Sequence, residues 1–321
     1  MKAMILAAGL GTRLRPLTIE RAKPAIPLIG KPLVVTLIEK LMENGASDFR
    51  INLHHLPHTI EKLFNSTPWS HLPVSFSFEP QILGTAGGLK TNEAFFQSGT
   101  FFMANGDILQ DFPLAEALSF HREHGALATL LLYQQDPPYL YSPIRIDKEG
   151  RLKNFKGISQ EGYLRPETYL FTGIHILEPE IFRFIPPEIF FEINDQVYPE
   201  ALRRGMPIYG FPVRGYWNDL GDPGRYLRVQ KDWFQRLGIV PPIHISLEAD
   251  RSEKAFLGPF VSAGAGCVME PGSRVENTIL WENVHLRRGA SVRNCIVGSG
   301  MIIDGVHMNE IISRNGTVPL A

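Results

Sequence analysis

The sequence predicts an α/β fold, a Rossmann-like and mostly parallel sheet with helices on both faces, followed by a C-terminal parallel β-helix. Over roughly the first two-thirds of the 321 residues, short apolar runs alternate with amphipathic stretches, which is the βαβ rhythm of a parallel sheet covered by helices. Beyond residue 250, glycines punctuate apolar steps of about six residues without a helical period, which is typical of β-helix coils. A small β-sandwich is the alternative for this tail, but the steps are too short for hairpins.

The expected elements follow from local patterns along the chain. Short apolar runs predict strands at residues 2–8, 50–53, 74–78, 100–104, 126–133 and 169–177. Amphipathic stretches predict helices at residues 32–45, 59–65, 88–96, 113–124, 195–204 and 222–237, the last opened by an Asp222 N-cap and Pro223. Residues 144–147 and 151–155 are expected to pair as a hairpin. The predicted domains are therefore an α/β domain (1–237), a linker (238–250) and the β-helix (251–321).

Composition restricts the classes of protein. The 32 Lys and Arg nearly cancel the 33 Asp and Glu, so no chain-wide charge attracts nucleic acid or an anionic membrane. No apolar run approaches the ~18 residues of a membrane span. The apolar N-terminus breaks at Gly9 and runs into Arg13, which fits a strand entering a glycine loop better than a signal peptide. Cys267 and Cys295 form no CxxC pair and are expected to be buried in a reducing compartment. These features predict a cytoplasmic protein.

A glycine-containing loop follows the first predicted strand. Gly9 and Gly11 let backbone N–H groups approach phosphate oxygens, Arg13 offers a planar fork, and Lys23 adds a mobile positive charge. The dinucleotide-binding fingerprint is absent because Leu14 stands where its third glycine belongs, and no P-loop Gly-Lys-Ser/Thr follows. Two glycines alone fit a tight strand-to-loop turn better than a phosphate site, so the wider sequence must decide.

The wider sequence resembles the sugar-1-phosphate nucleotidyltransferase family. The residues that carry the resemblance are AAGLGTRLRPLT (7–18) and PLIGKPL (27–33), then EPQILGTAGG (79–88), FFMANGD (101–107) and YWNDLG (216–221). The resemblance covers residues 1–236. The tail resembles the left-handed β-helix appended to many members of the family, including its mannose-1-phosphate guanylyltransferases.

The resemblance implies transfer of a nucleotidyl group from an NTP to a sugar 1-phosphate, giving an NDP-sugar and pyrophosphate, with Mg²⁺ as cofactor. It also implies roles for individual residues. The catalytic group is Arg13, Lys23, Asp107 and Asp219, of which Asp107 and Asp219 would bind the metal. The nucleotide-binding group is Ala8, Gly9, Gly11, Thr12, Glu79 and Gly84. The sugar-phosphate group is Asn105, Lys156 and Gly173, and at Lys156 the family's usual Glu-Lys-Pro is replaced by Phe-Lys-Gly.

Physical reasoning also supports Asp107 and Asp219 as metal ligands. Asp107 follows a predicted parallel strand at its carboxyl end, where open α/β sheets bind ligands, and carboxylates there suit Mg²⁺. A turn residue after Asn-Gly is the alternative for Asp107. Asp219 is not needed as a helix cap because Asp222 already caps the next helix, so it can serve as a metal ligand. Asp111 is expected to be an exposed N-cap before Pro113.

Glu79 bears on the choice of nucleotide. A carboxylate only accepts hydrogen bonds, and guanine offers N1–H and N2–H₂ on one edge, whereas uracil offers a single N3–H. Glu79 therefore favours GTP, then UTP, with a solvated loop glutamate as the alternative. Lys156 has a similar alternative as a solvated hairpin lysine.

A non-catalytic subunit that binds an NDP-sugar and docks through its β-helix is the rival interpretation. Loss of Arg13, Lys23 or either aspartate would favour it, and all four are present. The expected partners are the NTP and the sugar 1-phosphate, with self-association favoured by the open edge of a β-helix. The sequence leaves open which sugar is used. Because every candidate catalytic residue precedes Leu220, the tail is expected to affect assembly or stability before chemistry.

Overall fold

The computed structural model describes residues 1–65, 68–137 and 141–320. These residues form two compact units. The first unit comprises Met1–Gly9 and Val34–Asp219, and the second comprises Leu10–Leu33 with the chain from Leu220 onward. The glycine loop predicted to bind phosphate therefore begins in one unit and continues in the other.

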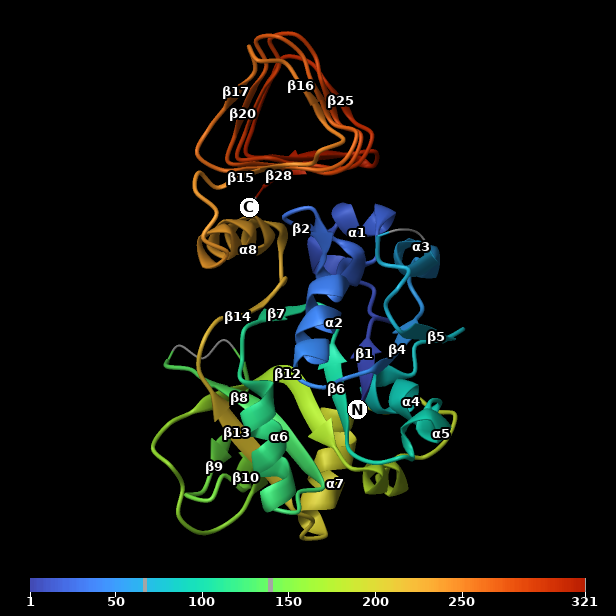
Figure 1. Ribbon diagram of the computed structural model, residues 1–321. Helices are drawn as coiled ribbons and strands as arrows, with labels where there is room; N and C mark the ends of the chain where they lie inside the picture. The colour runs from blue at the N-terminus through green and yellow to red at the C-terminus, as the bar shows by residue number, and fades with distance from the viewer. Residues whose placement is uncertain (66–67, 138–140, 321) are drawn as a thin grey trace. The chain divides into compact units, whose positions relative to one another are not determined.

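The first unit is built on a seven-stranded sheet in the order β13-β8-β12-β6-β1-β4-β5 (Figure 1). Its strands are β1 (Lys2–Leu6), β4 (Asp48–Leu53), β5 (Val74–Phe78), β6 (Phe101–Asn105), β8 (Ala128–Gln134), β12 (Tyr169–Leu177) and β13 (Ile208–Val213). Strand β12 runs antiparallel to β6 and β8, and every other neighbouring pair is parallel. The mostly parallel sheet is confirmed.

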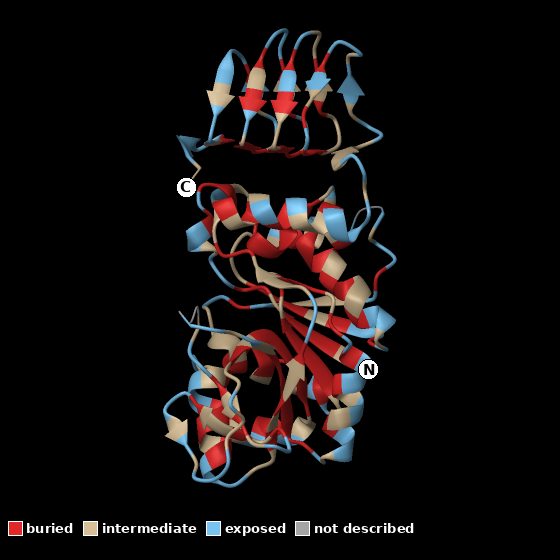
Figure 2. Cartoon of the chain, turned by 90° about the vertical axis from the view of Figure 1, so that its left-hand side faces the viewer, coloured by how far each residue is buried: buried red, intermediate tan, exposed pale blue. Residues whose placement is uncertain are grey.

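Helices cover both faces of this sheet. They are α2 (Leu33–Glu43), α3 (Pro57–Asn65), α4 (Gly84–Lys90), α5 (Glu93–Phe96), α6 (Leu114–Glu123) and α7 (Tyr198–Arg203). Met4 and Leu130 face a core shared with α4 and α7, whereas Thr129, the neighbour of Leu130, hydrogen-bonds His121 of α6. Because side chains alternate along a strand, these helices lie on opposite faces. Figure 2 shows the central strands between them as mostly buried.

One helix differs from the expectation. The single helix predicted at residues 88–96 is two short ones, and α4 already begins at Gly84. The side chain of Asn92 donates a hydrogen bond to the carbonyl of Gly88 over 2.9 Å, which satisfies a carbonyl near the end of α4 and closes it.

Smaller elements complete the first unit. Strands β9 (Arg145–Ile146) and β10 (Leu152–Phe155) pair antiparallel, which confirms the predicted hairpin, and β11 (Ile158–Ser159) adds a third strand. Strands β7 (Ile108–Gln110) and β14 (Trp217–Asp219) form a separate antiparallel pair. A 3₁₀ helix, η3 (Pro179–Phe184), follows β12, and a π-helical turn, η4 (Ile193–Val197), leads into α7.

The second unit contains the segment Leu10–Leu33, here called the loop segment. It holds η1 (Thr12–Leu14), α1 (Leu17–Glu20), η2 (Lys23–Ala25) and a two-strand ribbon of β2 (Pro27–Leu28) and β3 (Lys31–Pro32). Helix α8 (Pro223–Arg236) belongs to the same unit. Its start is as predicted, because Asp222 is the N-cap and accepts a hydrogen bond from the backbone N–H of Arg225 over 2.7 Å.

The rest of the second unit is a three-sided parallel β-helix, drawn as a triangular coil in Figure 1. One side is β15 (Ile243–Ile245), β18 (Val261–Ala263), β21 (Thr278–Leu280), β24 (Ile296–Val297) and β27 (Glu310–Ser313), closed by the antiparallel β28 (Gly316–Pro319). The second is β16 (Asp250–Arg251), β19 (Val268–Met269), β22 (His285–Leu286) and β25 (Ile302–Ile303), and the third is β17 (Phe256–Leu257), β20 (Arg274–Glu276), β23 (Ser291–Arg293) and β26 (Val306–Met308). The coiled tail is confirmed.

The β-helix begins earlier than predicted. Ile243 of β15 already pairs with Val261, so the first coil starts inside the predicted linker, residues 238–250. The prediction also placed Cys267 and Cys295 correctly as buried free thiols, and burial raises the pKa of Cys267 to about 11. Among the residues described, no helix combines the length and apolar character needed to cross a membrane.

Candidate active site

The β7–β14 pair brings the two predicted metal-binding aspartates together. Asp107 lies in the turn between β6 and β7, and Asp219 ends β14. In the antiparallel register Asp219 lies opposite Ile108, the residue next to Asp107. The two carboxylates therefore come from adjoining positions at the carboxyl end of β6, the edge where open α/β sheets bind ligands.

These two residues suit a divalent cation of the magnesium type. Mg²⁺ in proteins is commonly held by one or two carboxylates and completes its shell with water and substrate phosphates. Among the described residues there is no cluster of three or more His, Cys, Asp or Glu that would form a protein-only metal cage. A pair of carboxylates at the carboxyl edge of an open α/β sheet is the arrangement expected for a metal that is shared with substrate.

Aromatic side chains that the sequence reasoning missed surround Asp219. The hydroxyl of Tyr141 donates a hydrogen bond to Oδ2 of Asp219 over 2.5 Å, and its ring packs edge-on against Trp217. The indole N–H of Trp217 donates to the carbonyl of Thr172 over 2.8 Å, which ties β14 to β12. Trp217 lies inside a recognised motif, but nothing in the sequence points to Tyr141, which is remote from Asp219 along the chain.

The interpretation of Asp111 as a helix N-cap is wrong. Helix α6 begins at Leu114 after Pro113, and no side chain caps it. Instead, Oδ1 of Asp111 accepts a hydrogen bond from the backbone N–H of Tyr216 over 2.6 Å. Asp111 therefore secures the turn that leads into β14 and hence the position of Asp219.

Two of the three predicted sugar-phosphate residues meet. Gly173 has a φ of +90° where the pairing of β12 with β8 shifts register, and Asn105 ends β6. A Cβ on Gly173 would lie 2.8 Å from Nδ2 of Asn105, so the amide packs directly on the glycine. A side chain at position 173 would both strain the backbone and displace Asn105.

Lys156, the third of these residues, has a partner that the sequence did not indicate. Lys156 and Gly157 form the two-residue turn between β10 and β11, with φ values of 47° and 80°. The ammonium group of Lys156 lies 2.7 Å from Oδ1 of Asp195, in η4. A carboxylate thus accompanies this lysine although the family's preceding Glu is missing, and sugar-phosphate binding by Lys156 stays a prediction.

Glu79 is buried and serves the loop that carries it. Its side chain is only 1% exposed. Oε1 accepts a hydrogen bond from Asn52 over 2.7 Å, and Oε2 accepts one from the backbone N–H of Leu83 over 3.0 Å. Asn52 in turn accepts a hydrogen bond from the backbone N–H of Ala7 over 2.8 Å. This geometry does not support direct reading of a base by Glu79, and it favours a positioning role in which Asn52 links the end of β1 to residues 79–83.

Gly84 is held from the other side of the same loop. It has a φ of +73°, and a Cβ there would lie 2.7 Å from the carbonyl oxygen of Phe191. That carbonyl accepts hydrogen bonds from the N–H groups of Ala86 and Gly87, while the hydroxyl of Thr85 donates to Glu192 over 2.6 Å. The tight backbone at Gly84 explains why glycine is required there.

The glycine loop is partly exposed to solvent. Ala8 is buried, whereas Gly9 is exposed and a Cβ on it would meet no atom within 4 Å. Gly11 has a φ of +62°, and its carbonyl accepts a hydrogen bond from the hydroxyl of Thr18 over 2.8 Å. Thr12 is exposed. Backbone groups of this loop can therefore approach a phosphate as predicted.

Each of the two predicted cations of the loop segment lies near a glycine. Lys23 is 8% exposed, and its Cβ lies 3.4 Å from where a Cβ on Gly11 would be. Arg13 is exposed, and its Nη1 lies 3.4 Å from the position of a Cβ on Gly221. Nη1 of Arg225 lies 2.9 Å from that same position. Two guanidinium groups thus converge on Gly221, an arrangement suited to an anion, and Arg225 is a residue that the sequence reasoning missed.

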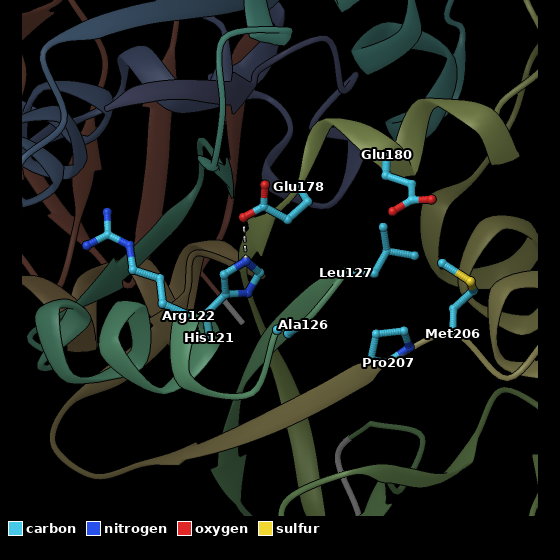
Figure 3. A pocket seen from close by; sticks show the side chains of 9 residues that line it. His121, Arg122, Ala126, Leu127, Glu178, Glu180, Met206 and Pro207 are labelled. Atoms are coloured by element: carbon cyan, nitrogen blue, oxygen red, sulfur yellow. Dashed lines mark hydrogen bonds and ion pairs between the residues drawn. The ribbon is translucent and has the colours of Figure 1, made fainter.

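A separate cavity of about 410 Å³ lies elsewhere in the first unit (Figure 3). Leu127 and Pro207, which line it, precede β8 and β13, so the cavity lies at the amino edge of the parallel strands, opposite the edge that carries Asp107. His121 on its wall hydrogen-bonds Thr129 and Glu178. Burial lowers the pKa of His121 and outweighs the opposing effect of Glu178. These contacts give His121 a structural role.

Comparisons with known proteins show the family of the chain. A nucleotidyl transferase family model matches residues 2–236, and a GMPPB C-terminal domain model matches residues 239–314. The chain is 30% identical to a UTP–glucose-1-phosphate uridylyltransferase of Synechocystis sp., covering 95% of this chain and 90% of the relative. It is 27% identical to mannose-1-phosphate guanylyltransferase 1 of Arabidopsis thaliana, covering 100% and 96%.

A solved structure shares the fold of the first part of the chain. HddC from Yersinia pseudotuberculosis superposes with a TM-score of 0.60 at 23% identity, covering 72% of this chain and 99% of that one. The family model spans most of the chain and includes all thirteen predicted site residues within residues 2–236. The chain belongs to the nucleotidyl transferase family and carries a C-terminal domain of the GMPPB type.

Proposed function

We propose that this chain, a sugar-1-phosphate nucleotidyltransferase, transfers GMP from GTP to mannose 1-phosphate, giving GDP-mannose and pyrophosphate. The observation that carries the proposal is the register of β7 and β14, which puts Asp107 and Asp219 at adjoining positions on the ligand-binding edge. The choice of GTP and mannose rests on the names of relatives that cover the whole chain. It does not rest on Glu79, which is buried.

The reaction needs positioning and charge neutralisation rather than a general base. An oxygen of the sugar phosphate, already an anion, attacks the α-phosphorus of the NTP, and the bond from that phosphorus to the β-phosphate oxygen breaks as pyrophosphate leaves. Asp107 and Asp219 would hold Mg²⁺, which when bound supplies positive charge next to the phosphates. Arg13 would bind the departing pyrophosphate, and the backbone of residues 8–12 would cradle the NTP phosphates.

The remaining residues are assigned to the sugar phosphate and to the base of the NTP. Asn105 and Gly173 lie together beside the turn that carries Asp107, so we assign them to the sugar phosphate, with Lys156 as a further contact. Backbone groups around Leu83 and Gly84 are assigned to the base, because this loop is rigidly held by Glu79 and Phe191.

A second candidate is the same reaction with UTP and glucose 1-phosphate. It is favoured by the relative from Synechocystis sp., which is 30% identical over 95% of the chain. Pyrophosphate release is measured with Mg²⁺ and a matrix of four NTPs against several sugar 1-phosphates. The proposal expects GTP with mannose 1-phosphate to give the highest kcat/KM. A preference for UTP with glucose 1-phosphate would establish the second candidate, and tight binding of an NDP-sugar without turnover in any combination would establish a non-catalytic subunit.

A further inference from the structure

The loop segment is supported by the C-terminal part of the chain. Residues 10–33 group with α8 and the β-helix in one compact unit, although the residues just before and after them belong to the first unit. This segment carries Arg13 and Lys23, both assigned to phosphate binding. The contacts inside this unit therefore decide how those cations are held.

The strongest of these contacts is made by Arg21. Its Nη1 and Nη2 donate to Oε1 and Oε2 of Glu282 over 2.9 and 2.6 Å, a bidentate pair. Nη2 also lies 3.1 Å from the hydroxyl of Ser299, which itself donates to Glu282 over 2.8 Å. The guanidinium carbon stands 4.6 Å from the ring centre of the buried Trp281, a cation–π contact. Arg21 is thus fixed in plane and direction by two successive coils of the β-helix.

The same tryptophan continues the network to the far end of the loop segment. Its indole N–H lies 3.3 Å from the hydroxyl of Tyr226, which donates to the carbonyl of Pro27 over 2.5 Å. Gln230 donates to that carbonyl over 2.7 Å and accepts from the backbone N–H of Ile29 over 2.8 Å. The side chains of Trp281, Tyr226 and Gln230 are buried, and α8 supplies hydrogen-bond partners for these two backbone groups.

Two further contacts hold the segment at its sides. Oε1 of Glu20 accepts a hydrogen bond from the backbone N–H of Arg314 over 2.8 Å. A Cβ on Gly30 would lie 2.4 Å from Nε2 of His244, so the tip of the β2–β3 ribbon packs directly against the first coil. The loop segment is therefore attached to the β-helix in its middle, at Glu20 and Arg21, and near its C-terminal end, at Gly30.

Helix α1 connects Arg21 to the glycine loop. Helix α1 has only four residues, and Arg21 follows its last one. The hydroxyl of Thr18, on the same short helix, donates to the carbonyl of Gly11. A displacement of Arg21 would thus be passed through one helical turn to Gly11, and Lys23 lies only two residues further on. Positions of phosphate-binding groups that are wrong by about 1 Å can cost a factor of about 100 in rate.

We propose that the β-helix takes part in catalysis by positioning the phosphate-binding loop, and that Arg21 and Glu282 are positioning residues for nucleotidyl transfer. The proposal rests on the proposed function for its kinetic readout. It also changes the expectation from the sequence that the tail affects assembly or stability before chemistry, because the tail supplies the partners of the loop.

The test compares Arg21→Gln and Glu282→Gln with Arg293→Gln. Arg293 is the matched control, since it also pairs with a glutamate of the β-helix, Glu276, over 2.7 Å, but does not touch the loop segment. We expect Arg21→Gln and Glu282→Gln to lower kcat/KM for the NTP by about 10- to 100-fold, with KM for the sugar 1-phosphate nearly unchanged. Arg21→Lys, which keeps the charge but not the fork, should recover part of the loss. The double variant should be no worse than either single variant.

Amide hydrogen exchange supplies a readout that does not require activity. Protection of residues 12–30 should fall in Arg21→Gln and Glu282→Gln, with no change in β1, β4 and β6 and none in Arg293→Gln. Unchanged exchange in the loop segment would overturn the proposal, as would an unchanged kcat/KM for the NTP in an active enzyme. If the wild type catalyses no transfer but the two variants still lose protection in the loop segment, the proposed function is contradicted and the anchoring is upheld. If Arg21→Gln does not fold, Glu282→Gln, which removes only the charge of the acceptor, gives the same comparison.

Discussion

Tyr141 donates its phenolic hydroxyl to Oδ2 of Asp219 over 2.5 Å, so one of the two predicted metal-binding carboxylates is oriented by an aromatic residue far away in sequence. The same ring packs against Trp217, whose indole is tied to Thr172. Outer groups that orient a metal-binding carboxylate affect metal affinity although they do not touch the metal.

Tyr141→Phe should raise the Mg²⁺ concentration needed for half-maximal activity by about 10-fold, because partners of metal ligands are typically worth 10- to 100-fold in metal affinity. The measurement is a Mg²⁺ titration of pyrophosphate release. Tyr133→Phe is the control, since Tyr133 stacks on Trp217 but donates its hydroxyl to the carbonyl of Gly215. An unchanged Mg²⁺ dependence in Tyr141→Phe would show that the hydrogen bond has no part in holding the metal.

Arg225→Gln should weaken product inhibition by pyrophosphate and lower kcat/KM by about 10-fold or more, as should Arg13→Gln. Both guanidinium groups converge on Gly221, and an anion that leaves during the reaction would gain from two cations rather than one. Arg228, an exposed arginine three residues further along α8, serves as the control. Wild-type inhibition by pyrophosphate in Arg225→Gln would remove this residue from the site.

Glu79→Gln should reduce stability and lower activity with GTP and inosine triphosphate equally. Its buried carboxylate satisfies Asn52 and the N–H of Leu83, and leaving a buried donor unpaired costs about 1–3 kcal/mol. The ratio of kcat/KM for GTP to that for inosine triphosphate, which lacks the 2-amino group, separates a positioning role from direct contact. If this ratio falls to about one in Glu79→Gln but stays unchanged in the exposed control Glu116→Gln, the carboxylate of Glu79 contacts guanine directly.

The contribution of Glu282 to stability should depend on pH. Burial tends to raise the pKa of this carboxyl, but hydrogen bonds from Arg21 and Ser299 and the charge of Arg21 outweigh it and hold the pKa below the ordinary 4.5. Because the pKa of Glu282 is lower in the folded than in the unfolded protein, its ionised carboxylate stabilises the fold above pH 4.5. This stabilisation is lost as the pH falls through the lowered pKa.

Urea unfolding of wild type and Glu282→Gln between pH 7 and about pH 3.5 measures this effect. The gap in unfolding free energy between the two proteins should be largest near neutral pH and should shrink as the solution is acidified. The exposed Glu253→Gln should leave no such gap. A gap that stays constant down to the lowest pH would mean that the charge of Glu282 does not stabilise the fold.

Much of the fold could be predicted from the sequence because its signals are local. The strand bounds at β5 and β12 match the predicted ranges, and the N-cap at Asp222 follows from two adjacent residues. Asp107 and Asp219 were predicted from short motifs, and the β7–β14 register then placed them at adjoining positions. Gly173 and Asn105 likewise come from separate motifs that the β6–β12 pairing joins.

What the sequence could not reveal depends on contacts between distant segments. Tyr141, Arg225 and Asn52 carry no recognisable motif, and their roles appear only when folding brings them to Asp219, Gly221 and Glu79. The sequence suggests a base-reading role for Glu79 because the burial of this side chain cannot be predicted from a loop of mixed polarity. The sequence favours a cap at Asp111 because an Asp before a Pro and a helix is a common capping pattern, whereas its actual partner lies in the turn before β14.

The two-carboxylate site is tested most directly by pyrophosphate release from Asp107→Asn and Asp219→Asn with saturating Mg²⁺, GTP and mannose 1-phosphate. Each change keeps the size of the side chain and removes the charge that would hold the metal. Asp304→Asn, an exposed aspartate paired with Arg287 in the β-helix, is the control. We expect each of the two variants to lose at least about 1,000-fold in kcat while the unfolding transition is preserved, because the metal supplies several kcal/mol of charge stabilisation. Near-wild-type turnover in either variant would contradict the account.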